Sequence, residues 1–296
     1  MSRNKNTIVV TGGAGFVGSN LIKFLIEKTN KNIISIDDYS SGTKKNHVKD
    51  SRVKYIVDST INIKKRLSKI RHSIDVIFHF GEFSRIPQSF YKINKCFQSN
   101  INATTEVIKF CLENKIRIIY SATSASLGNN GLDQNLSPYA FSKSKNLKLL
   151  INLNKWFGLK YEALYFYNVY GRNQIAKGYM STLIGIFEDK IRNNNTLPVV
   201  RPGTQKRTFT HIEDTIEGCY YAYTQKKNRH YALSNNKSLT ILQVANLFGG
   251  KIKFIPQRKG ERKKSTHPKK IGSIKIFKYK CKRDIVSYIK NFINET

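Results

Sequence analysis

The feature that most constrains this chain is an alternation of short apolar runs with longer helical stretches. Each run is rich in β-branched residues, and the runs are Thr7–Thr11, Asn32–Asp37, Val53–Asp58, Asp75–Phe80, Ile116–Ala122 and Tyr161–Phe166. Short apolar runs separated by helices are typical of a parallel sheet that is covered on both faces. The pattern therefore predicts a doubly wound α/β domain.

A glycine-rich loop follows the first run directly and opens a predicted helix over Phe16–Lys28. In TGGAGFVGSNL, the spacing of Gly12, Gly15 and Gly18 is G-x-x-G-x-x-G. Glycine lets the backbone turn tightly and approach a pyrophosphate, which the free N–H groups at the start of a helix can hold. The loop therefore predicts a dinucleotide-binding site on a Rossmann-type sheet.

Acidic residues end the second and third predicted strands. Asp37 can accept hydrogen bonds from the ribose hydroxyls of adenosine, and Asp37 and Asp38 would both repel a 2′-phosphate, which favours NAD over NADP. Lys44 and Lys45 follow closely and keep NADP open as the alternative. Asp58 ends the third strand, where a carboxylate can cap the adenine amino group or simply form a turn.

The second half of the chain is less regular than the first. Helical segments near Tyr179–Arg192 and Glu213–Tyr223 alternate with short strands and basic loops. A chain of 296 residues that is 40% hydrophobic can bury one large core with a small attached lobe. We therefore expect an NAD-binding Rossmann domain over residues 1–168 and a smaller substrate-binding lobe over 169–296, partly interleaved with it.

The stretch SPYAFSKSKN places Tyr139 four residues before Lys143. Ser137 suits the N-cap of a helix and Pro138 its first position, so the phenol and the ammonium would share one helix face. Because a nearby cation favours the phenolate, such a tyrosine could act as a base near neutral pH. The same spacing recurs elsewhere in the chain, so the spacing alone does not decide between chemistry and accident.

Two hydroxyl residues, Thr123 and Ser124, follow the fifth predicted strand in YSATSASLG. Hydroxyls after a strand are usually turn formers. Here they lie at the edge of the sheet where ligands bind, and Tyr139 and Lys143 follow within twenty residues. Thr123 with these two residues forms a set that can move a proton in a hydroxyl-to-ketone reaction beside a nicotinamide.

The net charge of +33 admits two interpretations. Strong basicity invites nucleic-acid binding. Against this, the lysines are scattered through almost every segment together with abundant Asn and Ile, whose codons are A/T-rich, so genome composition is the favoured explanation. The densest basic run, Pro256–Lys270, is expected to be a solvated surface.

The cysteines and the N-terminus indicate a cytoplasmic protein. The four cysteines have no C-x-x-C spacing and no histidines at metal-ligand distances, so we expect free thiols, a reducing compartment and no metal site. The N-terminal MSRNKNTIVVTGG lacks the apolar segment of a signal peptide, and no apolar run is long enough to span a bilayer.

Taken together, the motifs resemble the extended short-chain dehydrogenase/reductases of the nucleotide-sugar epimerase/dehydratase family, and UDP-glucose 4-epimerase-like enzymes most of all. The resemblance runs from about Thr7 to Arg262. It rests on TGGAGFVGSNL, HFGEFSRIPQS, SNINATTEVIKFC, SATSASLG, YAFSK, YFYNVYGR, RTFTHIED and RKGER.

The resemblance implies roles for individual residues. The catalytic residues would be Thr123, Tyr139 and Lys143. The residues that bind NAD would be Tyr139 and Lys143 together with Gly12, Gly15, Phe16, Val17, Gly18, Asp37, Asp38, Asp58, Phe80, Gly81, Asn100 and Phe166. The residues that bind a nucleotide sugar, expected to be a UDP-sugar, would be Ser84, Thr123, Asn168, Arg207 and Arg258.

The resemblance also implies a homodimer that pairs through two helices, near Asn100–Glu113 and Tyr139–Trp156. Their apolar residues include Ile101, Ile108, Leu149, Leu153 and Trp156. The alternative is that these side chains face only the sheet.

The chain departs from the family pattern at three places. Tyr165 replaces an arginine, Thr208 replaces an aspartate after Arg207, and the segment beyond Arg262 is short and basic and lacks the common Ala-Asp followed by a helix. These departures bear on the choice of sugar more than on the redox core.

The expected reaction is epimerisation at C4 of a UDP-hexose through a transient 4-keto sugar. A 4,6-dehydratase of this family has Asp-Glu directly after the catalytic threonine, whereas this chain has Ser124 and Ala125. Because alanine cannot move a proton, dehydration is disfavoured, and so is decarboxylation, whose enzymes resemble the dehydratases here. An alternative of another class is an idle Rossmann protein that binds NAD(H) or nucleic acid, against which the retained catalytic residues argue.

Overall fold

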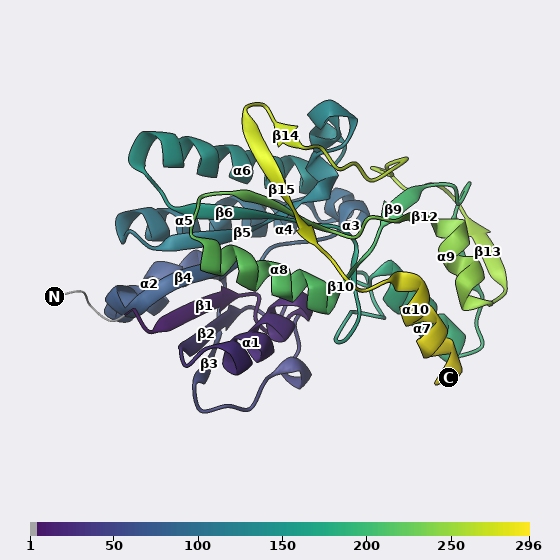
Figure 1. Ribbon diagram of the computed structural model, residues 1–296, viewed down its shortest axis with the longest axis horizontal. Coiled ribbons are helices and arrows are strands. Elements are labelled where there is room, and N and C mark those ends of the chain that lie inside the picture. The colour runs from purple at the N-terminus through teal and green to yellow at the C-terminus, as the bar shows by residue number, and fades with distance from the viewer. Residues whose placement is uncertain (1–4) are drawn as a thin grey trace.

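The computed structural model describes residues 5–296 and, within them, shows one large sheet of nine strands (Figure 1). In spatial order the strands are β14 (Lys270–Ile271), β15 (Ile274–Lys280), β11 (His230–Ser234), β6 (Tyr161–Phe166), β5 (Arg117–Thr123), β4 (Ile74–His79), β1 (Thr7–Thr11), β2 (Asn32–Asp37) and β3 (Val53–Val57). Neighbouring strands are parallel except for β14, which runs antiparallel to β15. The six predicted strands are all present, and their ends agree to within one residue.

Helices cover both faces of the sheet, as predicted (Figure 1). One face carries α2 (Ile63–Leu67), α5 (Thr104–Glu113) and α6 (Pro138–Phe157), and the other carries α1 (Phe16–Lys28) and α8 (Ile212–Gln225). Each face has its own buried cluster, with Ile77, Tyr120 and Leu150 in the first and Ile8, Leu21 and Leu233 in the second. Burying each such side chain stabilises the fold by about 1.5–3 kcal/mol.

The C-terminal half contributes to both parts of the molecule. Residues after 168 supply β11, β14, β15 and α8 to the large sheet, and the rest forms a smaller lobe. The lobe contains β7 (Val169–Tyr170), α7 (Leu183–Arg192), β8 (Leu197–Val200), β9 (Lys206–Thr208), β10 (Thr210–His211), β12 (Ser238–Thr240), α9 (Ile241–Phe248), β13 (Ile252–Ile255) and α10 (Ile285–Asn294). Its core packs Phe187, Phe248 and Ile289. Within residues 5–296, no helix is long and apolar enough to cross a membrane.

The segment beyond Arg262 does contain a helix, although its sequence lacks the Ala-Asp that precedes a helix in the family pattern. Helix α10 begins after Asp284, whose carboxylate accepts hydrogen bonds from the backbone N–H groups of Val286 and Ser287 at 3.1 and 3.2 Å. A side-chain oxygen at this position satisfies the free amides of the first turn, so the helix forms without the usual Ala-Asp pair.

The two ends of α6 follow from the local sequence. The Ser137 hydroxyl accepts a hydrogen bond from the N–H of Ala140 at 3.1 Å, and Pro138 is the first helical residue, as predicted. The helix ends at Gly158, whose φ of 69° lies in the left-handed region. Tyr139 therefore lies in the first turn.

The apolar residues expected at a dimer interface differ in how deeply they are buried. Ile108 on α5 is 1% exposed and packs in the core against the sheet, so it cannot serve an interface. Trp156 and its neighbour Phe157 are 63% and 66% exposed at the end of α6. Leu149 and Leu153 are half-buried against the same core.

The strand order places the site. Strands β1 and β4 are neighbours although they are not consecutive in the chain, which makes the point between them the place where the direction of winding changes. In sheets of this type, ligands bind in the crevice beyond the carboxyl ends of the strands at this point. The glycine loop follows β1, and the loop with Glu82 and Phe83 follows β4.

Candidate active site

A cavity of about 630 Å³ lies at the carboxyl ends of the central strands. It is lined by all the residues that the sequence predicts for catalysis and for substrate binding, and by all those predicted to bind a cofactor except Asn100. The fold therefore brings together residues that are as far apart in the chain as Gly12 and Arg258.

The glycine loop is packed so tightly that side chains cannot replace its hydrogens. Gly12 has a φ of 70°, and a Cβ on it would lie 2.8 Å from the backbone nitrogen of Gly81 in the loop after β4. A Cβ on Gly18 would lie 2.1 Å from the carbonyl oxygen of Gly12. The loop is thus held against both α1 and the neighbouring loop, and the first turn of α1 opens on the cavity beside Phe16 and Val17.

Asp37 at the end of β2 is fixed by backbone donors. Its Oδ2 accepts a hydrogen bond from the N–H of Ala14 at 2.9 Å, and its Oδ1 accepts one from the N–H of Tyr39 at 2.8 Å. Burial raises the pKa of its carboxyl group. Asp38 is exposed and also lines the cavity, whereas Lys44 and Lys45 are not among the lining residues that the structure describes.

Asp58 forms a turn, which was one of the two alternatives. Its Oδ1 accepts hydrogen bonds from the N–H of Ser59 at 2.7 Å and from Asn62 Nδ2 at 2.8 Å, and its Oδ2 pairs with Arg66. Hydrogen bonds from Asn62 and Arg66 lower the pKa of the carboxyl group. Asp58 still borders the cavity, but its carboxylate has protein partners already.

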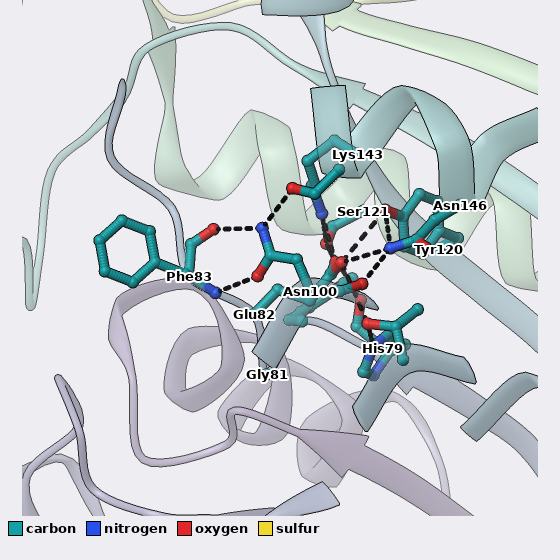
Figure 2. Close-up of polar contacts among 12 residues, drawn as sticks. His79, Gly81, Glu82, Phe83, Asn100, Tyr120, Ser121, Lys143 and Asn146 are labelled. Atoms are coloured by element: carbon teal, nitrogen blue, oxygen red, sulfur yellow. Dashed lines mark hydrogen bonds and ion pairs between the residues drawn. The ribbon is translucent and has the colours of Figure 1, made fainter. Parts of the chain in front are cut away.

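Asn100 lies in a π-helical turn, Gln98–Ala103, directly before α5. Its Oδ1 accepts a hydrogen bond from the N–H of Phe83 at 2.7 Å, and its Nδ2 donates to the carbonyl oxygen of Phe83 at 3.0 Å (Figure 2). Asn100 therefore holds the loop after β4 in place and does not itself line the cavity.

Thr123 and Tyr139 meet inside the cavity. The Thr123 oxygen accepts a hydrogen bond from the N–H of Ala125 at 3.1 Å, which leaves its proton free to point elsewhere. The Thr123 hydroxyl faces the phenol of Tyr139 and lowers the pKa of that phenol. An oxygen placed between these two groups would have both a proton donor and a proton acceptor beside it.

The ionisation of Tyr139 differs from the sequence expectation. Burial raises the pKa of the phenol to about 12, although the nearby Thr123 hydroxyl lowers it. The charge of Glu82 raises this pKa further, and that of Arg85 lowers it. The expectation of a base near neutral pH, resting on Lys143 alone, left out both the burial and this carboxylate.

Lys143 makes an ion pair with Glu82, in a part of the site that the sequence analysis did not single out (Figure 2). The side chains are 4% and 2% exposed. Burial lowers the pKa of Lys143, and the charge of Glu82 opposes that shift. A signal was present in the sequence, because Glu82 is an acidic residue directly behind the buried strand β4 in a chain that has only 19.

Several arginines also line the cavity. Arg207 donates from Nη2 to Glu261 Oε1 at 2.7 Å, and Arg262 donates from Nη1 to the carbonyl oxygen of Ser124 at 2.8 Å. Arg85 donates from Nε to the carbonyl oxygen of Met180 at 2.9 Å. Arg262 is 7% exposed, so the basic run Pro256–Lys270 is not simply the solvated surface that the sequence led us to expect.

The chain matches known proteins over most of its length. The model of the NAD-dependent epimerase/dehydratase family matches residues 8–234. The chain belongs to this family. A putative UDP-glucose 4-epimerase of Methanocaldococcus jannaschii is 26% identical over 260 residues, 83% of each chain. An ADP-L-glycero-D-manno-heptose-6-epimerase of Brachyspira hyodysenteriae is 29% identical over 226 residues, 71% of this chain and 69% of that one.

A solved structure supports the fold. The UDP-glucose 4-epimerase of Thermotoga maritima, determined with UDP-glucose, superposes with a TM-score of 0.85 over 97% of both chains at 21% identity. At that identity the likeness concerns the fold, and this sheet and lobe have the arrangement of the family.

Two departures from the family pattern have structural partners here. Tyr165 is fully buried, and its hydroxyl lies 2.9 Å from His230 Nδ1, while the hydroxyl of Tyr161 lies 2.8 Å from Nε2 of the same ring. The Thr208 hydroxyl lies 2.9 Å from that of Ser238 and 2.8 Å from His267 Nε2. The first set joins β6 to β11 inside the sheet, and the second ties the arginine-bearing β9 to the C-terminal segment.

Proposed function

We propose that this member of the family is an NAD-dependent epimerase that inverts C4 of a nucleotide-linked hexose, a UDP-hexose in the first instance. One observation carries the proposal: Thr123 and Tyr139 face each other in a cavity that they share with the glycine loop, and Ala125 follows where a dehydratase needs a proton-carrying side chain. A site with one proton carrier at C4 can oxidise that carbon and reduce it again, but it cannot remove water from C5 and C6.

The residues around the glycine loop fit NAD. Gly12 and Gly18 let the loop turn tightly against the start of α1, because a Cβ on either would clash with the backbone around it, and a tight glycine turn of this kind suits a pyrophosphate. The first turn of α1 offers amides to such an anion, and the carboxylates of Asp37 and Asp38 suit ribose hydroxyls and repel a 2′-phosphate. When bound, NAD⁺ would supply the hydride acceptor for sugar C4 and a positively charged ring beside the phenol.

The chain's own residues would handle the proton. Tyr139 would take the proton of the C4 hydroxyl, and Thr123 would hydrogen-bond the same oxygen and fix its position. The 4-keto sugar would then turn in the cavity, and Tyr139 would return the proton when hydride is delivered to the other face. Lys143 lies on the same helix face, one turn after Tyr139, and would hold the ribose next to the nicotinamide.

The arginines that line the cavity suit the diphosphate of a sugar nucleotide. Charge-assisted hydrogen bonds from guanidinium groups to phosphate are short and strong. Arg207 is held in place by Glu261, and Arg258 lies on the exposed rim of the same cavity. Arg262 reaches the carbonyl oxygen of Ser124 and so lies nearer the sugar than the other two.

We also propose a homodimer, with Trp156 and Phe157 at its interface. Both rings are exposed at the end of α6, and exposed large aromatic side chains are enriched at interfaces between proteins.

The test is a panel of UDP- and dTDP-sugars incubated with the purified protein and NAD⁺. The proposal predicts a product of the same mass and different configuration, with no accumulation of NADH. Loss of one water would identify a dehydratase, and loss of carbon dioxide a decarboxylase. No change with any sugar nucleotide would favour the non-catalytic alternative, for which DNA binding that falls steeply with salt is the matching observation.

A further inference from the structure

Glu82 is the centre of a buried polar network behind the proposed catalytic residues (Figure 2). Its Oε2 makes the ion pair with Lys143. Its Oε1 accepts hydrogen bonds from the hydroxyl of Tyr120 at 3.1 Å and from Asn146 Nδ2 at 3.2 Å. Thr104 Oγ1 lies at 3.2 Å from the same oxygen. With donors on both oxygens, the carboxylate has one well-defined position.

The network also fixes the ammonium of Lys143. Besides the pair with Glu82, Nζ donates to Ser121 Oγ at 3.2 Å and lies 4.5 Å from the ring centroid of Tyr120. Ser121 in turn donates to the carbonyl oxygen of His79 at 3.0 Å. An ammonium buried to this degree is stable only with a partner, so removing Glu82 would leave an uncompensated charge.

The rest of the network is neutral. Nδ1 of His79 lies 2.8 Å from the Thr11 hydroxyl and Nε2 lies 2.9 Å from that of Thr104. Burial lowers the pKa of His79 to about 4, so the ring carries no charge at neutral pH. The carboxylate of Glu82 and the ammonium of Lys143 are therefore the charges that act on each other in this network.

We propose that Glu82 is a positioning residue for the reaction proposed above, on which this inference rests: its carboxylate holds the Lys143 ammonium in place and opposes the effect of that ammonium on the Tyr139 phenol. The ammonium on its own would favour the phenolate. A carboxylate in contact with it opposes that effect. Glu82 thus sets how easily the proposed base releases its proton.

Among the charged groups around Tyr139, Glu82 has a particular effect on the ionisation of the phenol. The titratable or charged groups that face Tyr139 are Glu82 and Arg85 from the loop after β4, Cys96 from α4 (Ile93–Phe97), Tyr120 from β5, Lys143 from α6 and Arg262 from the C-terminal segment. Burial raises the pKa of Cys96 to about 11 and that of Tyr120 well above its usual value. Among these groups in the described chain, Glu82 contributes the carboxylate, which is paired with Lys143.

The experiment replaces Tyr139 by a ring-fluorinated tyrosine, whose phenol ionises at lower pH, and follows its titration by fluorine NMR. Glu82→Gln keeps the shape of the side chain and removes its charge. We expect the transition of the fluorinated phenol to move to lower pH by about one unit, the effect of a nearby charge on a pKa. This readout needs neither substrate nor turnover.

Two further variants control the experiment. Glu162→Gln removes another buried carboxylate, which is paired with Arg117. This pair lies at the amino-terminal ends of β5 and β6, at the edge of the sheet opposite the cavity, so the variant should leave the transition unchanged. Glu82→Asp keeps the charge and should stay close to the parent, and Glu82→Ala replaces Glu82→Gln if the latter does not fold. The proposal would be overturned if the phenol in Glu82→Gln or Glu82→Ala titrated at the same pH as in Glu162→Gln, or at a higher pH than in the parent.

The same variants separate this inference from the proposed function. If the parent turns over a sugar nucleotide, the acid limb of its pH profile should move to lower pH in Glu82→Gln together with the NMR transition. If the NMR transition moves but no sugar nucleotide is converted, the proposed function fails while the control of Tyr139 by Glu82 is supported.

Discussion

Replacing Gly18 by alanine should weaken NAD binding while the fold survives. The new Cβ would lie 2.1 Å from the carbonyl oxygen of Gly12 and 2.8 Å from its carbonyl carbon. Non-bonded atoms meet at about 3.5–4.0 Å, so the loop and α1 must separate by more than about 1 Å. Overpacking of this kind costs about 1–3 kcal/mol of stability.

The same displacement would carry the amides of the loop and of the first turn of α1 away from a bound pyrophosphate. A hydrogen bond to a charged group contributes about 1.5–3 kcal/mol. Losing one of them should weaken NAD binding roughly 10- to 150-fold. The binding loss is therefore of the same size as the stability loss, and the two must be measured separately.

Calorimetric titration with NAD and urea unfolding separate these effects when Gly158→Ala serves as the control. Gly158 ends α6 with a φ of 69°, and a Cβ added to it would meet no other atom within 4 Å, so alanine there costs about 1–2 kcal/mol through backbone conformation alone. We expect Gly158→Ala to lose stability and bind NAD like the parent. If Gly18→Ala binds NAD as tightly as Gly158→Ala does, the assignment of the glycine loop is wrong.

Tyr139→Phe should lower turnover by at least about 10²-fold with unchanged NAD affinity, since it removes the proton carrier and keeps the ring. Thr123→Ala should lower turnover by about 10²-fold. Steady-state kinetics check both, and a fully active Tyr139→Phe variant would contradict the role of Tyr139. kcat/KM, which reports ionisations of the free enzyme, should rise with pH across the neutral range. Burial raises the pKa of Tyr139 to about 12, so the phenolate fraction grows as the pH increases. A flat profile would refute this. Light scattering at micromolar concentration should give the mass of a dimer, and replacing Trp156 and Phe157 by serine should give a monomer; a parent that is already monomeric counts against the interface.

Much of the fold follows from local sequence. Helix α6 begins where Ser137 and Pro138 predict, because an N-cap hydroxyl and a fixed φ act within one turn. Strands β1 and β2 and helix α1 have the predicted bounds, since buried β-branched runs and the glycine loop leave the backbone few alternatives. The cavity then follows from the strand order, which brings the loops after β1 and β4 together.

The charges inside the site could not be predicted in this way. Glu82 and Lys143 are 61 residues apart, and only the packing of α6 on the sheet brings them into contact. Arg262 lies in a basic run that looks solvated in the sequence, and its burial depends on a contact with Ser124, 138 residues away. The ionisation of Tyr139 depends on such long-range neighbours and on burial, which the i, i+4 spacing does not encode.

The most direct test of C4 chemistry uses a UDP-hexose that carries deuterium in place of the hydrogen on C4. If Tyr139 and Thr123 serve oxidation and reduction at one carbon, NMR should find the product inverted at C4 with the deuterium still attached to C4. A product that carries the deuterium on C6, or that has exchanged it with solvent, would contradict the account.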